Sequence, residues 1–258
     1  MKNLLLLLLL CFFMSAKAQR DSQFHIGLES GGFALEGKID DRWDFRQPTD
    51  YQPAYRYYHG SEKAYGEGTL FYVGIKPQLA LWNDRITLAS GVRYIHVQER
   101  ITSGSKTYPL FLYSTSREGI DLFRVNGIDE SLGYLTIPME VNLAVIGNRH
   151  VWHIYVKGGV QAGMKIHGKT EIDFVSDKLD KYNDEVLAGI GKAPASFFSD
   201  VYTSIGVRFI LRNAMRLSLD FPAFHSILSK GNFSLLNSQT FPGMQVTIST
   251  PVNFFSTK

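Results

Sequence analysis

Apolar and polar residues alternate along eight segments of this chain. The clearest segment has Leu135, Ile137, Met139, Val141, Leu143 and Val145 in alternation with Tyr134, Thr136, Pro138, Glu140, Asn142 and Ala144. Successive side chains of a β-strand point to opposite faces, so this segment has one apolar and one polar face. The alternation predicts strands at about 24–29, 70–81, 86–94, 134–145, 153–166, 201–211, 215–222 and 244–254.

Short turns and long loops alternate between these strands. The turns lie at 82–85, 147–150 and 212–214, and the loops run roughly over 34–69, 98–132, 168–200 and 225–240. Both ends of the strand array fall on the short-turn side. This plan is typical of bacterial outer-membrane barrels. It predicts an all-β fold, an eight-stranded antiparallel up-and-down transmembrane β-barrel with short periplasmic turns and long extracellular loops.

Alternation alone does not say which face points outward, because a soluble lipocalin-like barrel would enclose its apolar face around a ligand. The polar face mixes charges with small residues: Gly27, Gly31, Gly74, Gly91, Gly159, Gly163 and Gly206. An eight-stranded barrel is just wide enough to be filled by side chains, so its interior needs small residues beside large ones. Trp82, Trp152 and Phe254 near the short-turn side fit an aromatic girdle. We therefore expect the polar face to point inward.

The first residues predict export. Lys2 precedes an apolar run from Leu4 to Met14, and Ala16-Lys17-Ala18 is a cleavage signal, so residues 1–18 are expected to be a signal peptide and 19–258 the barrel domain. The apolar run is too short to span a bilayer as a helix, which takes about 20 residues. A closed barrel is the other way to cross a membrane with the backbone satisfied. We therefore expect the protein in the outer membrane of a Gram-negative bacterium.

The net charge and the cysteine content restrict the classes of partner and of covalent cross-link that we expect. The chain has 27 basic and 24 acidic residues, and cleavage would remove Lys2 and Lys17, which leaves 27 − 2 = 25 basic residues and a net charge of +1. This balance argues against a nucleic-acid partner. The single cysteine, Cys11, lies in the predicted signal, so no disulfide is expected. The expected surroundings are outer-membrane lipid and lipopolysaccharide, with a possible protein partner at the extracellular loops.

Charged residues on the inward face predict a structural polar network in the lumen. Its expected members are Glu29, Lys76, Arg93, Glu140, Lys157, Arg208, Arg216 and Asp220. A charge inside a narrow barrel is costly unless it is paired. If Val145 opposes Trp152, Glu140 lies across from Lys157. If Leu211 opposes Met215, Arg208 faces Ser218 with Asp220 on the diagonal.

The first long loop is rich in aromatic residues and arginine, which are residue types that anchor binding surfaces. The candidate partner-binding residues are Trp43, Phe45, Tyr51, Tyr55, Arg56, Tyr57 and Tyr58. The alternative is that the flanking strands extend beyond the bilayer and these residues pack against that extension.

Little else in the sequence suggests a catalytic or metal-binding site. The seven histidines are scattered without metal-ligand spacing, the acidic third loop has no EF-hand spacing, and no G-x-S-x-G motif occurs. A lipid-modifying enzyme would need a histidine, a serine and a carboxylate; His96 with Ser90, or His225 with Ser226, supply the first two without a carboxylate at fixed spacing. We expect no catalytic residues, no metal and no cofactor.

The stretch Gly133-Tyr134-Leu135-Thr136-Ile137-Pro138-Met139-Glu140-Val141 resembles the YLxIPL strand of the PorT-like outer-membrane barrel family of Bacteroidota. Gly91-Val92-Arg93-Tyr94 is similar to the strand before it in those proteins, and the hairpin through Tyr155 to Gly163 also looks similar. The resemblance implies an eight-stranded outer-membrane barrel over the whole mature chain. For PorT itself it would imply a part in type IX secretion. The family pattern supplies no catalytic residue.

These observations predict a non-enzymatic barrel that presents extracellular loops to a partner or ligand. One alternative is an accessory component of a type IX secretion or gliding system. Another is a lipid-A-modifying barrel enzyme.

Overall fold

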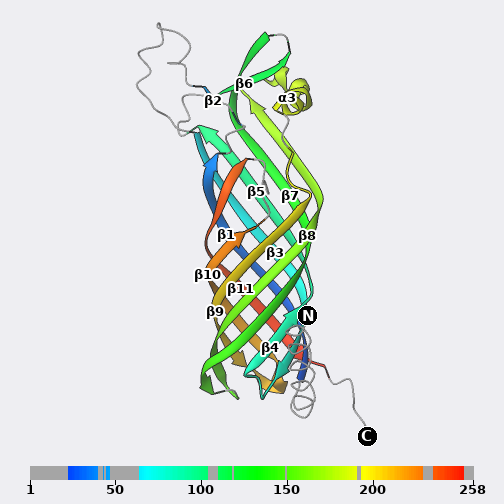
Figure 1. Ribbon diagram of the computed structural model, residues 1–258, viewed down its shortest axis with the longest axis vertical. Coiled ribbons are helices and arrows are strands. Elements are labelled where there is room, and N and C mark those ends of the chain that lie inside the picture. The colour runs from blue at the N-terminus through cyan, green and yellow to red at the C-terminus, as the bar shows by residue number, and fades with distance from the viewer. Residues whose placement is uncertain are drawn as a thin grey trace, which may run out of the picture.

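The chain folds into an antiparallel sheet whose strands close into a ring of eight. The computed structural model describes residues 23–39, 43, 45–46, 64–103, 110–117, 119–148, 150–190, 193–228 and 235–252. The ring consists of β1 (Gln23–Ile39), β3 (Ala64–Leu81), β4 (Ile86–Ser90) with β5 (Val92–Ser103), β7 (Gly119–Asn148), β8 (Trp152–Phe174), β9 (Phe197–Ile210), β10 (Arg216–Ile227) and β11 (Leu236–Pro251). Pairing of β1 with β11 closes it, which removes most exposed strand edges (Figure 1).

The strands β4 and β5 are one ring strand that is interrupted at Gly91. This glycine has φ +155°, and a Cβ atom there would collide with the carbonyl oxygen of Ile75 on β3. Only glycine allows the backbones to approach this closely. Both β4 and β5 pair with β3 on one side and β7 on the other, so the interruption does not open the ring.

The short turns gather at one end of the ring, here called the lower end, where the two ends of the strand array also lie (Figure 1). The expected turns are confirmed: β3 ends at Leu81 and β4 begins at Ile86, β7 ends at Asn148 and β8 begins at Trp152, and the 3-10 turn η3 covers Arg212–Ala214. The residues Trp82, Asn83 and Asp84 have φ of 51°, 56° and 70°. Asn and Asp are the non-glycine residues that tolerate this left-handed conformation best.

The upper end differs from the expected long loops. Strands continue into all four ranges that the sequence assigned to loops, and β6 (Leu110–Arg117) pairs with β7 inside the second of them. The short β2 (Phe45–Arg46) adds to β6, while η2 (Asp177–Tyr182) and α3 (Asn183–Ile190) lie beside these strands at the top of Figure 1. The upper end is therefore a built extension of the ring and not a set of plain loops.

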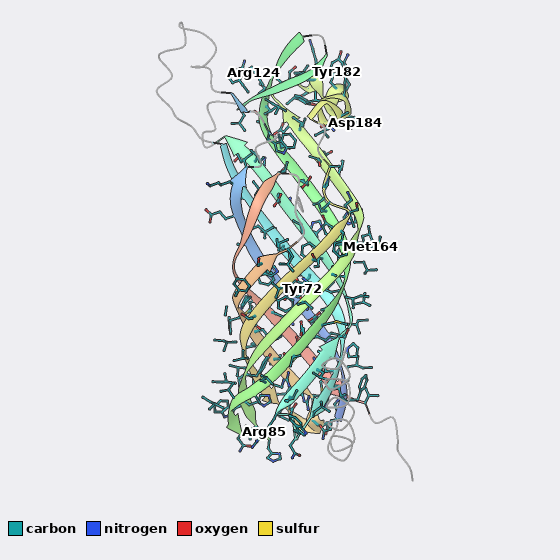
Figure 2. The ribbon with its side chains drawn as sticks, viewed as in Figure 1. Tyr72, Arg85, Arg124, Met164, Tyr182 and Asp184 are labelled. Atoms are coloured by element: carbon teal, nitrogen blue, oxygen red, sulfur yellow. The ribbon has the colours of Figure 1, made fainter. Side chains whose placement is uncertain are left out.

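Below this extension the ring has an apolar exterior and a polar interior. Leu135, Ile137, Met139, Val141 and Leu143 of β7 are all exposed, whereas Thr136, Glu140 and Asn142 between them are buried. The other ring strands repeat this arrangement, and Figure 2 shows Met164 on the outer surface and Tyr72 within the ring. The expected direction of the two faces is confirmed in this part of the chain.

The polarity reverses in the extension. On β5, Val97 and Ile101 point inward and are fully buried, while Gln98 and Arg100 point outward and are exposed. Two apolar clusters lie in the interior, one at the boundary with the polar part below and one above it. The lower one contains Leu35, Leu70, Tyr72, Ile95, Val97, Leu132, Tyr134 and Phe198. The upper one contains Trp43, Ile101, Leu110, Leu112, Val125, Ile128, Ile172, Phe174, Val186, Leu235 and Leu236. The extension is thus organised like a water-soluble β-structure.

None of the helices in the described residues is long and apolar enough to cross a membrane.

Candidate functional site

Four charged side chains meet at the centre of the polar interior. Lys76 Nζ lies 2.6 Å from Glu29 Oε2 and 2.9 Å from Glu140 Oε2. Arg93 Nε lies 2.8 Å from Glu29 Oε1, and Arg93 Nη2 lies 2.9 Å from Glu140 Oε1. Each cation therefore contacts both carboxylates, and the formal charges cancel. Such close double pairing is what offsets the cost of removing these charges from water.

A second layer of polar side chains satisfies the remaining atoms of this group. Gln245 Nε2 donates to Glu29 Oε2 at 2.8 Å, and the Tyr202 hydroxyl donates to Glu140 Oε1 at 2.6 Å. The Tyr72 hydroxyl and Lys157 Nζ both donate to Gln245 Oε1, at 2.9 and 2.8 Å. The guanidinium of Arg93 also lies over the Tyr72 ring, 4.4 Å from its centroid. The interior at this level is a connected network, and a connected network holds its members rigidly.

Lys157 links this network to Asp220 on β10. Its Nζ lies 3.1 Å from Asp220 Oδ2, and the Tyr155 hydroxyl donates to Asp220 Oδ1 at 2.7 Å. The Gly206 position opposite Asp220 has no room for a side chain, because a Cβ there would come 2.6 Å from both Asp220 Oδ1 and the Tyr155 hydroxyl oxygen. This is the small-beside-large packing expected of a narrow interior.

The lower end of the interior is closed by a separate ion-pair cluster. Asp84, from the turn between β3 and β4, reaches Arg216 Nη2 at 3.0 Å and Arg208 Nη1 at 3.4 Å. Arg208 also donates to Thr87 Oγ1 at 3.0 Å and to Ser218 Oγ at 3.1 Å. One acidic turn residue thus holds two buried arginines in place.

A chain of hydrogen bonds also runs from Arg93 of the central group to His225 on β10. Arg93 Nη1 donates to Gln161 Oε1 at 2.7 Å, and Gln161 Nε2 donates to Asp200 Oδ2 at 2.6 Å. The same Asp200 oxygen lies 2.6 Å from His225 Nε2. The sequence had offered His225 without a carboxylate partner, and the structure provides one from the neighbouring strand β9.

All eight residues expected in the lumen network are buried and point inward. Four of them form the central group, Arg208 and Arg216 belong to the lower cluster, and Lys157 and Asp220 form the pair that adjoins the central group. The register across β7 and β8 differs from expectation, because Glu140 lies opposite Gly159 and Lys157 lies opposite Asn142. An irregularity between Ala144 and Ile146 shifts the pairing near the turn. Across β9 and β10 the expected opposition of Arg208 and Ser218 is correct, but Asp220 pairs with Lys157 and not with Arg208.

Several network members were not in the expected set: Tyr72, Asp84, Tyr155, Gln161, Asp200, Tyr202 and Gln245. The period of two places Tyr72, Gln161 and Gln245 on the polar face, so their uncharged polar groups were the available signal. Asp84 lies in a turn, where the alternation carries no information about direction.

The aromatic residues of the first long loop are only partly described. Trp43 is buried in the upper apolar cluster and so packs within the extension. Phe45 is in β2 and pairs through its backbone with Leu112 of β6. The other candidates, Tyr51, Tyr55, Arg56, Tyr57 and Tyr58, lie outside the described residues. For Trp43, the arrangement matches the alternative in which the aromatic residues pack against extended strands.

No protein-family model and no curated protein matches this chain. Among solved structures, the transport unit of the autotransporter AIDA-I from Escherichia coli is similar over 90% of both chains, with 8% sequence identity and a TM-score of 0.23. That likeness is too weak to support an argument about function. The site is therefore interpreted from its own geometry.

Proposed function

We propose that this protein is a non-enzymatic transmembrane β-barrel of a bacterial outer membrane that presents its upper extension to a partner or ligand outside the cell. The observation that carries the proposal is the reversal of polarity along the strands. Below the reversal, apolar side chains face out and ion pairs lie inside; above it, the arrangement is that of a protein in water. A strand that changes its outward face in this way fits two different solvents, lipid below and water above.

Residues at the ends of the apolar band support this placement. Trp82 and Trp152 are exposed beside the short turns at its lower edge. At its upper edge, the Tyr94 hydroxyl lies 2.9 Å from His167 Nε2 on the outer surface. Amphipathic aromatic side chains favour the boundary between lipid and water. The apolar band between these residues is the part that we assign to the bilayer.

The interior favours a structural role for the buried charges. In the central group each cation contacts both carboxylates, Tyr202 donates to Glu140 and Gln245 donates to Glu29. We therefore assign contact with a partner to the extension and its loops, and stability to the charges inside the ring.

The proposal is tested first by the heat dependence of gel mobility. The full chain is expressed in a Gram-negative host, outer membranes are isolated, and the extracted protein is run on SDS gels with and without boiling. A closed membrane barrel resists SDS until it is heated, so we expect the unboiled band to migrate differently. Recovery in the soluble periplasmic fraction, with a single band, would contradict the proposal.

Orientation is tested by a pair of epitope insertions. One tag is inserted between Tyr55 and Arg56 in the first loop, and the matched control tag between Asn148 and Arg149 in a short turn. Antibody should label the first tag on intact cells and the second only after the outer membrane is permeabilised. Labelling of the turn tag on intact cells would show that the extension does not face outward.

A further inference from the structure

The wall of the ring is incomplete between β10 and β11. Their backbone pairing runs from Arg216 opposite Ser249 to Asp220 opposite Gln245 and stops there. Above this point, among the residues that the structure describes, β10 continues to Ile227 paired with β9 alone, and β11 comes down from Leu236 paired with β1 alone. The two facing edges therefore leave a seam in the wall, bounded below by the pair of Asp220 and Gln245.

Prolines and strand irregularities explain why the pairing ends at this level. Pro222 follows the last paired residues of β10, and the register of β10 against β9 shifts between Pro222 and Phe224. In β11, Pro242 lies just above Gly243, where the register against β1 also shifts. Proline has no N–H to donate to a neighbouring strand and is confined to edges and bulges of sheets. The two prolines thus fit unpaired strand edges, and the folded ring places these edges opposite each other.

Side chains close the seam in place of backbone hydrogen bonds. Phe33 of β1 and His225 of β10 are stacked, with ring centroids 4.8 Å apart and an angle of 24° between the rings. Phe33 lies opposite Gly243 of β11, and a Cβ on Gly243 would come 2.8 Å from the Phe33 ring. The Phe33 ring therefore crosses β11 at its glycine to reach His225. This stack can separate without breaking any strand pairing.

Polar groups lie directly behind the stack. A small cavity there, of about 10 Å³, is lined by Arg93, Lys157, Gln161, Asp220 and Gln245 as well as by the stacked rings. That volume is about enough for one water molecule. His225 belongs to the hydrogen-bonded chain that runs through Asp200 and Gln161 to Arg93. The inner side of the seam is thus polar and nearly filled.

The outer side of the seam is apolar. Phe221 and Phe224 of β10, Leu228 just beyond its end and Met244 of β11 are all at least half exposed, between 50% and 58%. The seam, which is the gap between two neighbouring strands, therefore connects an apolar outer surface with a polar interior. Exposed strand edges are tolerated at membrane depth only where protein, water or a bound group satisfies the backbone.

We propose that the seam is a lateral binding site for a single-chain amphiphile with a compact hydrogen-bonding head, of which a fatty acid is the simplest example. The inference rests on the proposed membrane location. The chain lies outside, between Phe224 and Met244, and the head enters beside His225 when the Phe33 ring swings away. The space that the Phe33 ring vacates, together with the small cavity, is enough for a carboxylate but not for a bulky head group, and the gap between two strands admits one chain.

The test uses a dodecanoic acid probe that carries a diazirine next to the carboxylate and a terminal alkyne. Protein in bilayers is irradiated with the probe, and adducts are mapped by mass spectrometry. We expect adducts on inward residues behind the seam, Tyr72 and Gln245, and on outward residues such as Leu135 and Ile137. An excess of plain dodecanoate should suppress only the inward adducts, because only those come from a saturable site.

Two variants make the test specific. A disulfide between Phe221→Cys and Met244→Cys, the first residue pair above the last paired one, locks the seam and should abolish the inward adducts until it is reduced. A Cys11→Ser background leaves no other cysteine in the chain. Phe33→Ala removes the closing ring and should increase the inward adducts. The heat shift on SDS gels checks that each variant is folded.

The outcomes separate the two proposals. Adducts on outward residues alone, in both wild type and Phe33→Ala, would overturn the lateral site and leave the membrane location intact. Inward adducts that persist in the locked variant would show that the probe enters elsewhere and would also overturn it. An absence of adducts on Leu135 and Ile137 would overturn the membrane location itself.

Discussion

Arg93 and Glu29 are joined by two parallel hydrogen bonds inside the ring, Nε to Oε1 at 2.8 Å and Nη2 to Oε2 at 3.0 Å. Arg93 is on β5 and Glu29 on β1, with β3 between them, so the bond spans the interior across one intervening strand. Bidentate pairing of this kind fixes both side chains in direction as well as in distance. The central group thereby ties together strands that are not neighbours in the wall.

Removal of one carboxylate from the central group should destabilise the ring strongly. Within the described part of the chain, Glu140→Gln leaves Glu29 as the one carboxylate paired with Lys76 and Arg93, so we expect a loss of about 3 kcal/mol in the free energy of unfolding. Urea unfolding in detergent micelles measures it. The control is Glu171→Gln on the outer surface of the extension, where the pair with Lys169 is exposed and worth less than about 1 kcal/mol. Equal effects of the two variants would contradict the structural role of the network.

The lower cluster depends on the single carboxylate of Asp84. Asp84→Asn keeps a residue that tolerates φ of 70° but removes the charge that faces Arg208 and Arg216. We expect a loss of about 2 kcal/mol, the scale of a hydrogen bond to a charged group. The temperature at which the SDS-resistant band disappears measures it. Asp177→Asn in η2 is the control, and this exposed site should leave that temperature unchanged.

The level of the membrane can be found by arginine substitution on the outer face. Val141→Arg puts a charge in the apolar band and should cost about 2–4 kcal/mol in lipid. Gln98→Arg, on the exposed polar surface above the reversal, should be nearly neutral. Folding yield into lipid vesicles compares the two. A tolerated arginine at Val141 would argue that this face is not in contact with lipid.

The upper apolar cluster should melt separately from the ring. Ile128→Ala removes a fully buried side chain from that cluster and should cost about 2–5 kcal/mol locally. In a Trp82→Phe, Trp152→Phe background, Trp43 is the remaining tryptophan, so its emission reports on the cluster. We expect a red shift at lower urea concentration than in the parent, with the SDS-resistant band retained. Ile137→Ala, on the outer surface of the ring, should not move the Trp43 transition.

The alternation in sequence was sufficient to predict the ring strands, the direction of their faces and the inward charges. It did not predict the strand ends, because the sense of the alternation reverses. Above Tyr94, the apolar Val97 faces inward while Gln98 and Arg100 face outward. A search for apolar residues on the outward face therefore ends the strand near Tyr94, although the strand continues. The pairing of Glu140 was missed because an irregularity near Ala144 changes the register, and a sequence read strand by strand does not reveal where such irregularities occur.

The seam and the packing of Trp43 could not be predicted for a different reason. Both depend on contacts between residues far apart in the chain, Phe33 with His225 and Trp43 with the strands of the extension. The alternation gave no signal that the pairing of β10 with β11 stops at Asp220 and Gln245, and only the folded ring shows that the two strand edges above this point face each other.

The length of β7 determines how any external contact would be presented. From the reversal near Gly133 the strand continues to its first residue, Gly119, a path of about 50 Å at the usual rise per residue. The apolar core inside the extension makes this section a stiff column and not a tether. If the apolar band lies in a bilayer as proposed, a molecule that docks at the tip of this section is held at a set height above the lipid and in a set orientation, so its distance and angle are properties of the fold itself.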